Sequence, residues 1–536
     1  MVVLRSALTA SLLASSAAAL DPIVMKGTKF FTKSDGKQFY IKGVAYQQDT
    51  SGAGGETTGT KYKDPLADET SCKRDVPLLK NAGVNTIRTY AINPDADHDA
   101  CMKLLDDAGI YVIADLGEPA VSINRDSPAW NIKLFDRYKG VIDNLAKYDN
   151  VIGFFSGNEV TNNNTNTDAS AFVKAATRDT KKYIADKQAN GGRWMGVGYA
   201  ANDDSEIRAN MAHYFNCGNQ DEAIDFWGYN IYSWCGDSSF TKSGYDVQVD
   251  FFSNYSVPVF FAEYGCNSDG ADGRKWDDTT ALYSDQMTGV FSGGIVYMYF
   301  QEANDYGLVE LNNGKATEMD NFKVLATKLN KVDPTTVDMS SYTPSNSPAS
   351  CPPISDSWKV TGALPPTPDS DLCDCMYKSL SCAPADDLAE KDFGEIFGYI
   401  CSQDPDACAG IKSDTASGVY GPYLGCNPKE QLGHVLDAYY QNQNKASTAC
   451  DFDGAAKVVS SPTVDSSCES PLASASSAVK VAATATAAAA SSGSGSSSSD
   501  SASAANRVGS FMTVGQMAAG AYMLAAMGVG AAMVAF

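Results

Sequence analysis

The chain has 536 residues, of which 44% are hydrophobic, and it carries 64 acidic against 41 basic residues, a net charge of −23. This length suffices for two or three domains, one of them with a large buried core. Because binding to nucleic acid requires clustered Lys and Arg that contact phosphates, the acidic balance excludes nucleic acid as a partner.

The first 20 residues have the pattern of a secretory signal peptide. They read MVVLRSALTASLLASSAAAL, with one Arg, an apolar stretch, and Ala17 and Ala19 placed for an A-x-A cleavage. The alternative is a buried N-terminal helix, but Asp21 and Pro22 follow at once and would end it. The sequence therefore predicts a secreted protein.

Residues 21–330 contain eight apolar, β-branched or aromatic runs, separated by stretches long enough for helices. The runs are residues 39–47 (FYIKGVAYQ), 86–92 (TIRTYAI), 111–116 (YVIADL), 151–160 (VIGFFSGNEV), 195–200 (MGVGYA), 226–234 (FWGYNIYSW), 258–266 (PVFFAEYGC) and 293–302 (GGIVYMYFQE). Amphipathic segments such as residues 75–82 and 171–184 lie between them. Apolar strands that alternate with such helices are typically parallel and covered by the helices, so the pattern predicts an α/β protein with a (β/α)8 TIM barrel.

Three segments of different composition follow the predicted barrel. Residues 331–371 are rich in Pro, Ser and Thr and predict a linker that packs on the barrel. Residues 372–469 contain eight cysteines and two helical patterns, at 392–403 and 428–443, which predict a small, disulfide-rich, mainly helical domain. Residues 470–505 are low-complexity Ser and Ala, which predicts a disordered, O-glycosylated stalk.

The C-terminal tail, residues 506–536, predicts a membrane attachment signal. It is uncharged from Val508 onward and follows Arg507 and the small residues 501–505. Small residues, a short spacer and an apolar tail are the signal for a glycosylphosphatidylinositol (GPI) anchor. A transmembrane anchor is the alternative, against which the missing basic flank argues. We therefore expect a protein on the outer leaflet of the plasma membrane or passed to a cell wall.

The 14 cysteines indicate disulfides rather than a metal site. A metal site would need C-x2-C pairs or histidine partners, and the three histidines (His98, His213 and His434) are scattered. We expect no metal and no organic cofactor. Asn163 and Asn254 begin Asn-x-Ser/Thr sequons and predict N-glycosylation.

Two glutamates end predicted strands on the side of the barrel that carries active sites in such folds. Glu159 ends the run 151–160, and Glu263 lies near the end of the run 258–266. Tyrosines end three other runs, namely Tyr90, Tyr232, and Tyr297 with Tyr299. Aromatic rings stack on the apolar face of a pyranose, so carboxyl groups among tyrosines indicate glycoside chemistry.

Cleavage of a glycoside needs one carboxyl group that protonates the leaving oxygen and another that attacks or stabilises the oxocarbenium-like carbon. A gap of about 5–5.5 Å between them gives the retaining route. Because apolar or small residues precede Glu159, we expect an apolar wall that raises its pKa and keeps it a proton donor. Glu263 is then the nucleophile, its charge held by tyrosine hydroxyl groups.

Eight segments of the chain have the motifs of one known family. They are YQ at 46–47, IRTY at 87–90, DLGEPAVSINRD at 115–126, SGNEVTN at 156–162, YAANDDSEIR at 199–208, YNIYSWCG at 229–236, PVFFAEYGC at 258–266 and GGIVYMYFQE at 293–302. These segments resemble glycoside hydrolase family 72, the fungal β-1,3-glucanosyltransferases of the Gas/Gel/Phr group. The Cys-rich unit resembles a family 43 carbohydrate-binding module, so the resemblance extends over about residues 21–505.

The resemblance implies roles for individual residues. Glu159 is implied as the acid/base, Glu263 as the nucleophile, and Asn158 as the residue that holds the sugar 2-hydroxyl. Other positions that match the family's glucan groove are Tyr90, Glu118, Ser122, Asn124, Arg125, Asp203, Arg208 and Tyr297. The resemblance also implies three disulfides, Cys72 with Cys101, Cys217 with Cys351 and Cys235 with Cys266. The other eight cysteines allow 105 connectivities, which stay open.

The implied activity is a retaining transglycosylation of β-1,3-glucan. Such an enzyme cleaves a donor chain internally, holds one part as an ester on Glu263 and passes it to the non-reducing end of an acceptor chain. Two alternatives remain. One is an endo-β-1,3-glucanase with the same two glutamates, and the other is a non-catalytic wall protein that only binds glucan.

Overall fold

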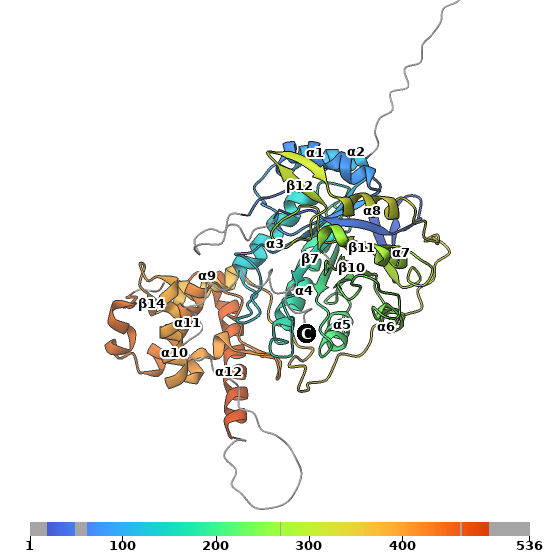
Figure 1. Ribbon diagram of the computed structural model, residues 1–536. Coiled ribbons are helices and arrows are strands. Elements are labelled where there is room, and N and C mark those ends of the chain that lie inside the picture. Colours follow the sequence, from blue (N-terminus) through green and yellow to red (C-terminus); the bar gives the residue numbers. More distant parts are fainter. Residues whose placement is uncertain (1–18, 49–61, 269, 461, 463, 492–536) are drawn as a thin grey trace, which may run out of the picture.

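The computed structural model describes residues 19–48, 62–268, 270–460, 462 and 464–491. The predicted GPI tail and all but the last two residues of the predicted signal peptide lie outside these ranges. Figure 1 shows a barrel with a smaller helical unit, the C-terminal module, beside it. Within the described ranges, no helix is both long and apolar enough to span a bilayer.

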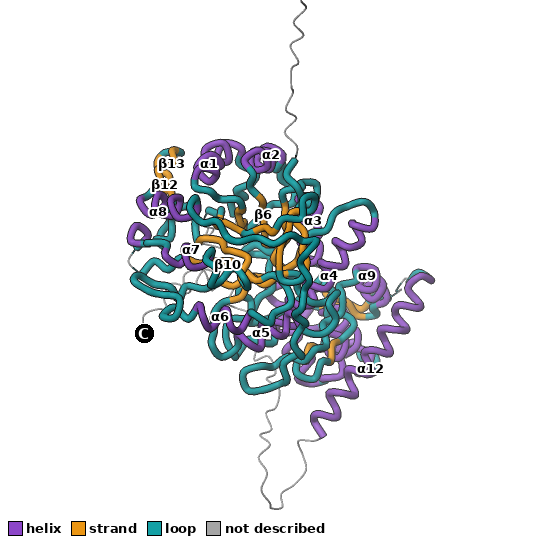
Figure 2. The backbone as a smooth tube through the Cα atoms, turned by 90° about the vertical axis from the view of Figure 1, so that its right-hand side faces the viewer, coloured by secondary structure: helices purple, strands orange, loops and turns teal. Residues whose placement is uncertain are grey.

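Eight parallel strands form a closed barrel in chain order, which confirms the predicted TIM barrel. They are β4 (Ile41–Ala45), β5 (Thr86–Thr89), β6 (Tyr111–Asp115), β7 (Val151–Asn158), β8 (Gly196–Ala201), β9 (Phe226–Asn230), β10 (Val259–Tyr264) and β11 (Phe291–Val296). The barrel closes where β11 pairs with β4. Figure 2 shows these strands enclosed by helices and loops. Burial on both faces explains why the strands are nearly continuous apolar runs.

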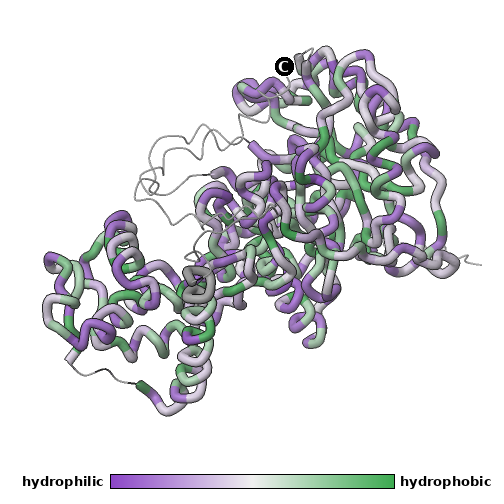
Figure 3. Tube along the Cα trace, turned by 90° about the horizontal axis from the view of Figure 1, so that it is seen from below, coloured by the Kyte–Doolittle hydropathy of each residue, from purple (hydrophilic) through white to green (hydrophobic). Residues whose placement is uncertain are grey.

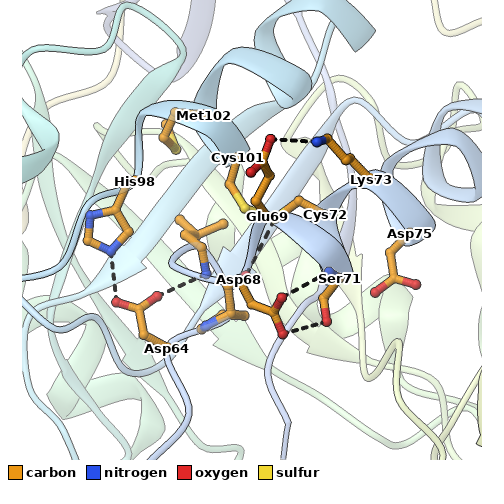
Figure 4. The surroundings of a disulfide bond; sticks show 12 residues. Asp64, Asp68, Glu69, Ser71, Cys72, Lys73, Asp75, His98, Cys101 and Met102 are labelled. Carbon is orange, nitrogen blue, oxygen red and sulfur yellow. Dashed lines mark hydrogen bonds and ion pairs between the residues drawn. A yellow bond between two sulfur atoms is a disulfide. The ribbon is translucent and has the colours of Figure 1, made fainter. Parts of the chain in front are cut away.

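In the described part of the barrel, eight α-helices accompany the strands. They are α1 (Glu69–Asn81), α2 (Asp99–Ala108), α3 (Ile132–Leu145), α4 (Ala169–Ala189), α5 (Arg208–Asn216), α6 (Tyr245–Phe252), α7 (Asp277–Leu282) and α8 (Asp320–Leu329), and the hairpin β12 (Val309–Asn312) and β13 (Lys315–Glu318) precedes α8. The side chains of Asp68 and Asn131 cap α1 and α3 by accepting backbone N–H groups of the first turn. The disulfide Cys72–Cys101 joins α1 to α2 (Figure 4).

The interior of the barrel is filled with apolar side chains from its N-terminal end. A small antiparallel sheet of β1 (Ile23–Lys26), β2 (Lys29–Thr32) and β3 (Gln38–Phe39) covers this end. Phe30 of β2 packs against Phe226 and Phe260, with 6.0 and 6.1 Å between ring centroids. Figure 3 shows apolar segments concentrated inside the barrel. Because apolar side chains fill the N-terminal end of the barrel, the C-terminal ends of the strands are where a site can form.

Residues 331–371, which we call the strap, run along the barrel and are held to it at several points. Lys26 Nζ donates a hydrogen bond to the carbonyl oxygen of Met339 at 2.7 Å. The disulfide Cys217–Cys351 bonds the strap to the loop after α5. Further along, Trp358 is fully buried, and its ring lies 5.2 Å from that of Tyr214. The strap therefore packs as part of the barrel rather than as a free tether.

The C-terminal module is small and helical, as the sequence predicts. It contains α9 (Ser370–Ser379), α10 (Phe393–Gln403) and α11 (Pro428–Asn442). Two small antiparallel sheets accompany them, one of β14 (Cys382–Pro384) with β17 (Ala456–Val458) and one of β15 (Ser413–Asp414) with β16 (Val419–Tyr420). Its eight cysteines pair as Cys373–Cys426, Cys375–Cys468, Cys382–Cys450 and Cys401–Cys408. The structure thus selects one of the connectivities that the sequence left open.

The module and the end of the strap contact α3 and α4 of the barrel. The backbone N–H of Ile132 donates to the carbonyl oxygen of Gly425 at 3.0 Å. The hydroxyl group of Thr367 donates to Asp179 Oδ1 at 2.6 Å. These bonds tie the module to the same face that the strap crosses.

The first part of the predicted stalk is a helix rather than a disordered segment. The helix α12 covers Glu469–Ser491, so the prediction of disorder is wrong for residues 470–491. Ala is the best helix former, and the disulfide Cys375–Cys468 fixes the chain just before the helix starts. Leu472, Ala475 and Val479, three and four residues apart, pack on the module and supply the contacts that a short helix needs. Residues 492–505 of the stalk lie outside the described ranges.

One histidine makes the module sensitive to acid. His434 of α11 lies against the ring of Tyr423, and its Nε2 atom is enclosed without a hydrogen-bond partner among the described residues. Burial lowers the pKa of His434 to about 4. In the unfolded chain its pKa is about 6.5, so between about pH 6.5 and 4 the unfolded state binds a proton that the folded state does not.

We therefore expect the module to lose about 3 kcal/mol of stability as the pH falls through this window. Calorimetric unfolding of wild type and His434→Leu at pH 7 and pH 4.5 measures the loss. The variant should lose less stability on acidification than wild type. Equal losses in both proteins would assign the acid sensitivity to other groups.

Candidate active site

Glu263 lies on β10 and is held by donors on both carboxylate oxygens. Its Oε1 accepts hydrogen bonds from Tyr90 Oη at 2.9 Å and from Arg88 Nη1 at 3.3 Å. Its Oε2 accepts from Tyr232 Oη at 2.8 Å. The residue is only 8% exposed, and burial raises its pKa to about 7. The charge of Arg88 opposes this rise in pKa, and the charge of Glu159 adds to it.

Glu159 follows β7 and is linked to Glu263 by hydrogen bonds through polar neighbours. Its Oε1 accepts from Asn230 Nδ2 at 2.9 Å, and its carbonyl oxygen accepts from Arg125 Nη2 at 2.7 Å. Its backbone is left-handed, with φ of +48°, an uncommon conformation for a residue other than glycine. This conformation turns the side chain out of the strand, and the residue is half-buried. The expectation of an apolar wall around Glu159 is therefore wrong. The buried carboxyl group of the pair is that of Glu263.

A continuous chain of hydrogen bonds joins the two carboxyl groups. Asn230 Nδ2 donates to Glu159 and also to Asn158 Oδ1, at 3.1 Å. Arg88 Nη2 donates to the same Asn158 oxygen at 2.9 Å, while its Nη1 reaches Glu263. Asn230 and Glu263 are also register partners on the adjacent strands β9 and β10. The network therefore fixes the positions of both glutamates relative to each other.

Arg88 is the centre of this network, and it is fully buried. Its Nε and Nη2 bind the two oxygens of Asp115, each at 3.0 Å. The guanidinium group lies 4.3 Å from the ring centroid of Tyr90 and 4.5 Å from that of Phe155. Sequence reasoning did not assign Arg88, Asp115 or Asn230 to the site. The available signal was a charged residue inside an otherwise uncharged run of β-branched residues, since charged residues are almost never fully buried unless paired.

Tyrosines form an aromatic wall beside Glu263. The ring of Tyr297 lies 6.4 Å from those of Tyr90 and Tyr232. Tyr306 follows at 5.4 Å from Tyr297 and 5.7 Å from Tyr232. Tyr306 comes from the loop after β11 and was not among the predicted residues. Such a wall offers faces on which pyranose rings stack.

The remaining predicted groove residues lie at the same end of the barrel, on loops except for Arg208, which is the first residue of α5. In the loop after β6, Glu118 accepts from the backbone N–H of Ala120, and Asn124 accepts from the backbone N–H of Asp126. Ser122 of this loop is exposed, and Arg125 reaches Glu159 as described. In the loop after β8, Asp203 accepts a hydrogen bond from Arg208 Nη1 at 2.7 Å and another from the hydroxyl group of Tyr229. The structure therefore brings Tyr90, Asn158, Arg125 and Tyr297 to the carboxyl pair and places the other predicted residues around it.

The disulfide Cys235–Cys266 joins the loops that follow β9 and β10. With Cys72–Cys101 and Cys217–Cys351, the structure contains the three pairs that the resemblance implies. Since Tyr232 and Glu263 lie on the two joined segments, this bridge limits how far the chain around Glu263 can open.

A family model described as Glucanosyltransferase, glycoside hydrolase family 72, matches residues 12–333. The chain belongs to this family. An X8 domain model matches residues 380–457 of this family 72 protein, within the predicted carbohydrate-binding module. Both matches confirm the resemblance drawn from the motifs.

Relatives and solved structures cover most of this family 72 chain. A 1,3-beta-glucanosyltransferase of Arthroderma benhamiae is 54% identical over 469 residues, which are 84% of this chain and 85% of that protein. The pH-responsive protein 1 of Candida albicans is 47% identical over 84% of this chain and 82% of its own length. A structure of Saccharomyces cerevisiae Gas2p with laminaritetraose and laminaripentaose has a TM-score of 0.75 at 38% identity, over 85% of this chain and 99% of that one.

Proposed function

We propose that the protein is a retaining β-1,3-glucanosyltransferase that elongates cell-wall glucan. It cleaves a β-1,3-glucan internally and transfers the new end to the non-reducing end of another β-1,3-glucan. The observation that carries this proposal is the pair Glu159 and Glu263, fixed by one hydrogen-bond network at the C-terminal mouth of a family 72 barrel. Membership of the glucanosyltransferase family favours transfer over hydrolysis.

Each carboxyl group has one role in the first step. A carboxylate oxygen of Glu263 bonds to the anomeric carbon while the glycosidic C–O bond breaks, and Glu159 gives its proton to the leaving 3-oxygen. In the second step the acceptor's 3-hydroxyl attacks the anomeric carbon and returns a proton to Glu159. The ester bond breaks, and the carboxylate of Glu263 is restored.

The assignment of the nucleophile follows from its hydrogen bonds. Three donors, from Tyr90, Tyr232 and Arg88, point at Glu263 and stabilise its ionised form. The charge of Glu159 contributes to the raised pKa of Glu263, so protonation of Glu159 favours ionisation of Glu263. The half-buried Glu159 can exchange a proton with an acceptor hydroxyl group, as an acid/base residue must.

Sugar contacts are assigned from the same geometry. The Oδ1 atom of Asn158 is occupied by Arg88 and Asn230, so we assign its amide nitrogen as the donor to the sugar 2-hydroxyl. The rings of Tyr90 and Tyr297 are assigned to stack on sugars beside Glu263. Further groove positions are assigned to Glu118, Ser122, Asn124, Arg125, Asp203 and Arg208.

The coupling of the two carboxyl groups predicts a pH shift. Glu159→Gln removes a negative charge that raises the pKa of Glu263, so this pKa should fall in the variant. The test follows the rate at which an epoxide-bearing β-1,3-glucoside esterifies Glu263 between pH 4 and 8. Since only the carboxylate attacks the epoxide, the acidic limb of labelling should move to lower pH in Glu159→Gln. A limb that stays in place would contradict the coupling.

Product analysis tests the proposed activity. The secreted chain is incubated with a β-1,3-gluco-oligosaccharide whose reducing end has been reduced, and products are sized by mass spectrometry. Products longer than the substrate would establish transfer. Only shorter products would make the protein an endo-β-1,3-glucanase, and no turnover would favour a glucan-binding wall protein.

We also propose that the protein is secreted and GPI-anchored at the cell surface, on the plasma membrane or in the wall. The signal-peptide pattern of residues 1–20 and the apolar tail 506–536 support this location. N-glycosylation is proposed at Asn254, which is exposed, and at Asn163, which is half-buried in a turn closed by Thr165. Release of the protein from cells by a phosphatidylinositol-specific phospholipase tests the anchor, and no release would contradict it.

A further inference from the structure

His98 lies directly before α2, and its side chain is fully buried. Its Nε2 atom is 2.8 Å from Asp64 Oδ2, and its Nδ1 atom is 2.6 Å from Asn144 Oδ1. Asp64 belongs to the loop between β4 and α1, and Asn144 belongs to α3. Figure 4 shows His98 and Asp64 pointing toward each other. One imidazole ring therefore connects this loop to two helices of the barrel.

The bond to Asn144 fixes one proton on the ring. Asn144 Nδ2 donates hydrogen bonds to the carbonyl oxygens of Pro94 and Ala96, each at 2.9 Å. The amide group is therefore oriented with its oxygen toward His98 Nδ1. Because an amide oxygen only accepts hydrogen bonds, Nδ1 is a donor and carries a proton.

The bond to Asp64 requires a second proton, on Nε2. Asp64 accepts the backbone N–H groups of Leu66 at 2.9 Å and of Asn93 at 2.7 Å, and these bonds stabilise its ionised form. Nε2 faces this carboxylate and donates to it only while the ring is an imidazolium. Asp64 and His98 thus form a buried ion pair.

Charged groups from three elements act on His98. Burial lowers the pKa of His98, but the hydrogen bond and the charge of Asp64 outweigh this effect and raise the pKa above its usual value. Lys147, which follows α3, opposes the rise in pKa, and it is itself paired with Asp99 of α2 at 2.8 Å. Since the folded state holds this proton more tightly than the unfolded chain does, the ion pair is present at lower pH and is lost as the pH rises through the pKa of His98.

The loop that carries Asp64 also holds residues 90–93, the segment that follows β5. Asp64 Oδ2 binds the backbone N–H of Asn93, and Tyr62 Oη donates to the carbonyl oxygen of Ile92 at 3.1 Å. A loop released from His98 therefore holds this segment less firmly.

Gln47 completes the connection to the active site. Its Nε2 donates to the carbonyl oxygen of Lys63 at 2.8 Å, and its Oε1 accepts the backbone N–H groups of Tyr90 and Ala91, each at 3.1 Å. The hydroxyl group of Tyr90 donates to Glu263 Oε1 at 2.9 Å. A series of contacts thus leads from the ion pair to the nucleophile.

We propose that His98 is a positioning residue for ester formation on Glu263, because its ion pair with Asp64 keeps the hydroxyl group of Tyr90 on the nucleophile. The reaction that is measured rests on the proposed function. When His98 loses its proton, the lone pair of Nε2 faces the carboxylate of Asp64, and attraction turns into repulsion. Tyr90 is then held less firmly, so ester formation slows at alkaline pH.

Fluoride release from a β-1,3-glucosyl fluoride in the first turnover measures ester formation alone, because fluoride leaves without a proton from Glu159. Wild type should show a bell-shaped pH profile, with an acidic limb from Glu263 and an alkaline limb from His98. His98→Gln should be about tenfold slower at the optimum and should lack the alkaline limb. Asp64→Asn, which removes the charge that retains the proton, should lack this limb too. His213→Gln on α5 is the matched control and should follow wild type.

A double-mutant cycle separates positioning from a general loss of stability. Because the effect passes through the hydroxyl group of Tyr90, His98→Gln should slow Tyr90→Phe by less than about twofold. The melting temperature of each variant is recorded in parallel. The full loss of rate in both backgrounds would overturn the proposal, as would an alkaline limb that persists in His98→Gln.

The charge of His98 is measured in wild type, without any substitution. The chain has three histidines, and burial lowers the pKa of His213 and His434. Nitrogen-15 NMR of the histidine rings at pH 7 should therefore show one doubly protonated ring. Absence of such a ring would overturn the proposal even if the variants failed to fold.

The role of His98 and the proposed function fail separately. If wild type releases fluoride but makes only shorter products from an oligosaccharide, transfer falls and the role of His98 in ester formation stands. If elongated products form and His98→Gln keeps the wild-type pH profile, only the role of His98 falls. No fluoride release by wild type would overturn both.

Discussion

Replacing Glu263 by Gln should reduce transfer by roughly 10⁴-fold or more, the largest effect expected of a single substitution in this protein. The amide cannot form the glycosyl ester, and no neighbouring group takes its place, since Tyr90, Tyr232 and Arg88 are all donors toward it. The loss should be the same for natural glucan and for a glucosyl fluoride. The measurement is the initial rate of product formation by chromatography.

Glu159→Gln is the matched variant that separates the two roles. Its rate of transfer with natural glucan should fall by roughly 10²–10⁴-fold, because the leaving oxygen of this substrate needs a proton. With a β-1,3-glucosyl fluoride it should still form the ester on Glu263, because fluoride leaves without protonation, and mass spectrometry of the protein detects the adduct. An adduct on Glu263→Gln, or equal losses of both variants on the fluoride, would contradict the assigned roles.

Arg88→Met should be the most destabilising change in the site, by about 3–5 kcal/mol. It removes the bidentate partner of buried Asp115 and a donor to buried Glu263, which leaves two carboxyl groups without their positive charge. It also removes the cation that lies between the rings of Tyr90 and Phe155. Denaturant unfolding followed by tryptophan fluorescence measures the change in the free energy of unfolding.

A surface ion pair provides the comparison. Lys103 and Asp107 form an i,i+4 pair on α2, with side chains 71% and 42% exposed. Lys103→Met should change the free energy of unfolding far less than Arg88→Met, because exposed ion pairs contribute little to stability. If Arg88→Met and Lys103→Met lowered the free energy of unfolding by similar amounts, the buried network would not stabilise the site. Arg88→Met with Asp115→Leu should recover part of the stability, because the double change leaves one fewer buried charge unpaired.

The barrel and its carboxyl pair could be predicted from the sequence because both signals are local. Each strand is a short apolar run, and Glu159 and Glu263 stand where such runs end. The network that joins them is long-range, since it connects residues 88, 115, 158, 230 and 263 through a closure that periodicity does not show. In the sequence alone, Arg88 is a single charged residue within an uncharged strand. Its role in the site is not evident until its partners are known.

Two further differences have physical causes. The half exposure of Glu159 depends on the left-handed backbone at that residue, which composition does not predict. The helix α12 was mistaken for disorder because its Ser and Ala composition is low in complexity, while its stability comes from the disulfide Cys375–Cys468 and from contacts of Leu472 and Ala475 with the module.

The strap determines where the gene can be cut to express the barrel alone. The family match ends at residue 333, but a fragment that stops there would lack Cys351 and Trp358. Cys217 would then be an unpaired buried thiol, and the ring of Tyr214 would face water. The shortest autonomous catalytic fragment therefore extends beyond Val360, which is also buried against the barrel. A useful expression boundary thus lies within the module-proximal end of the strap rather than at residue 333, where the family match ends.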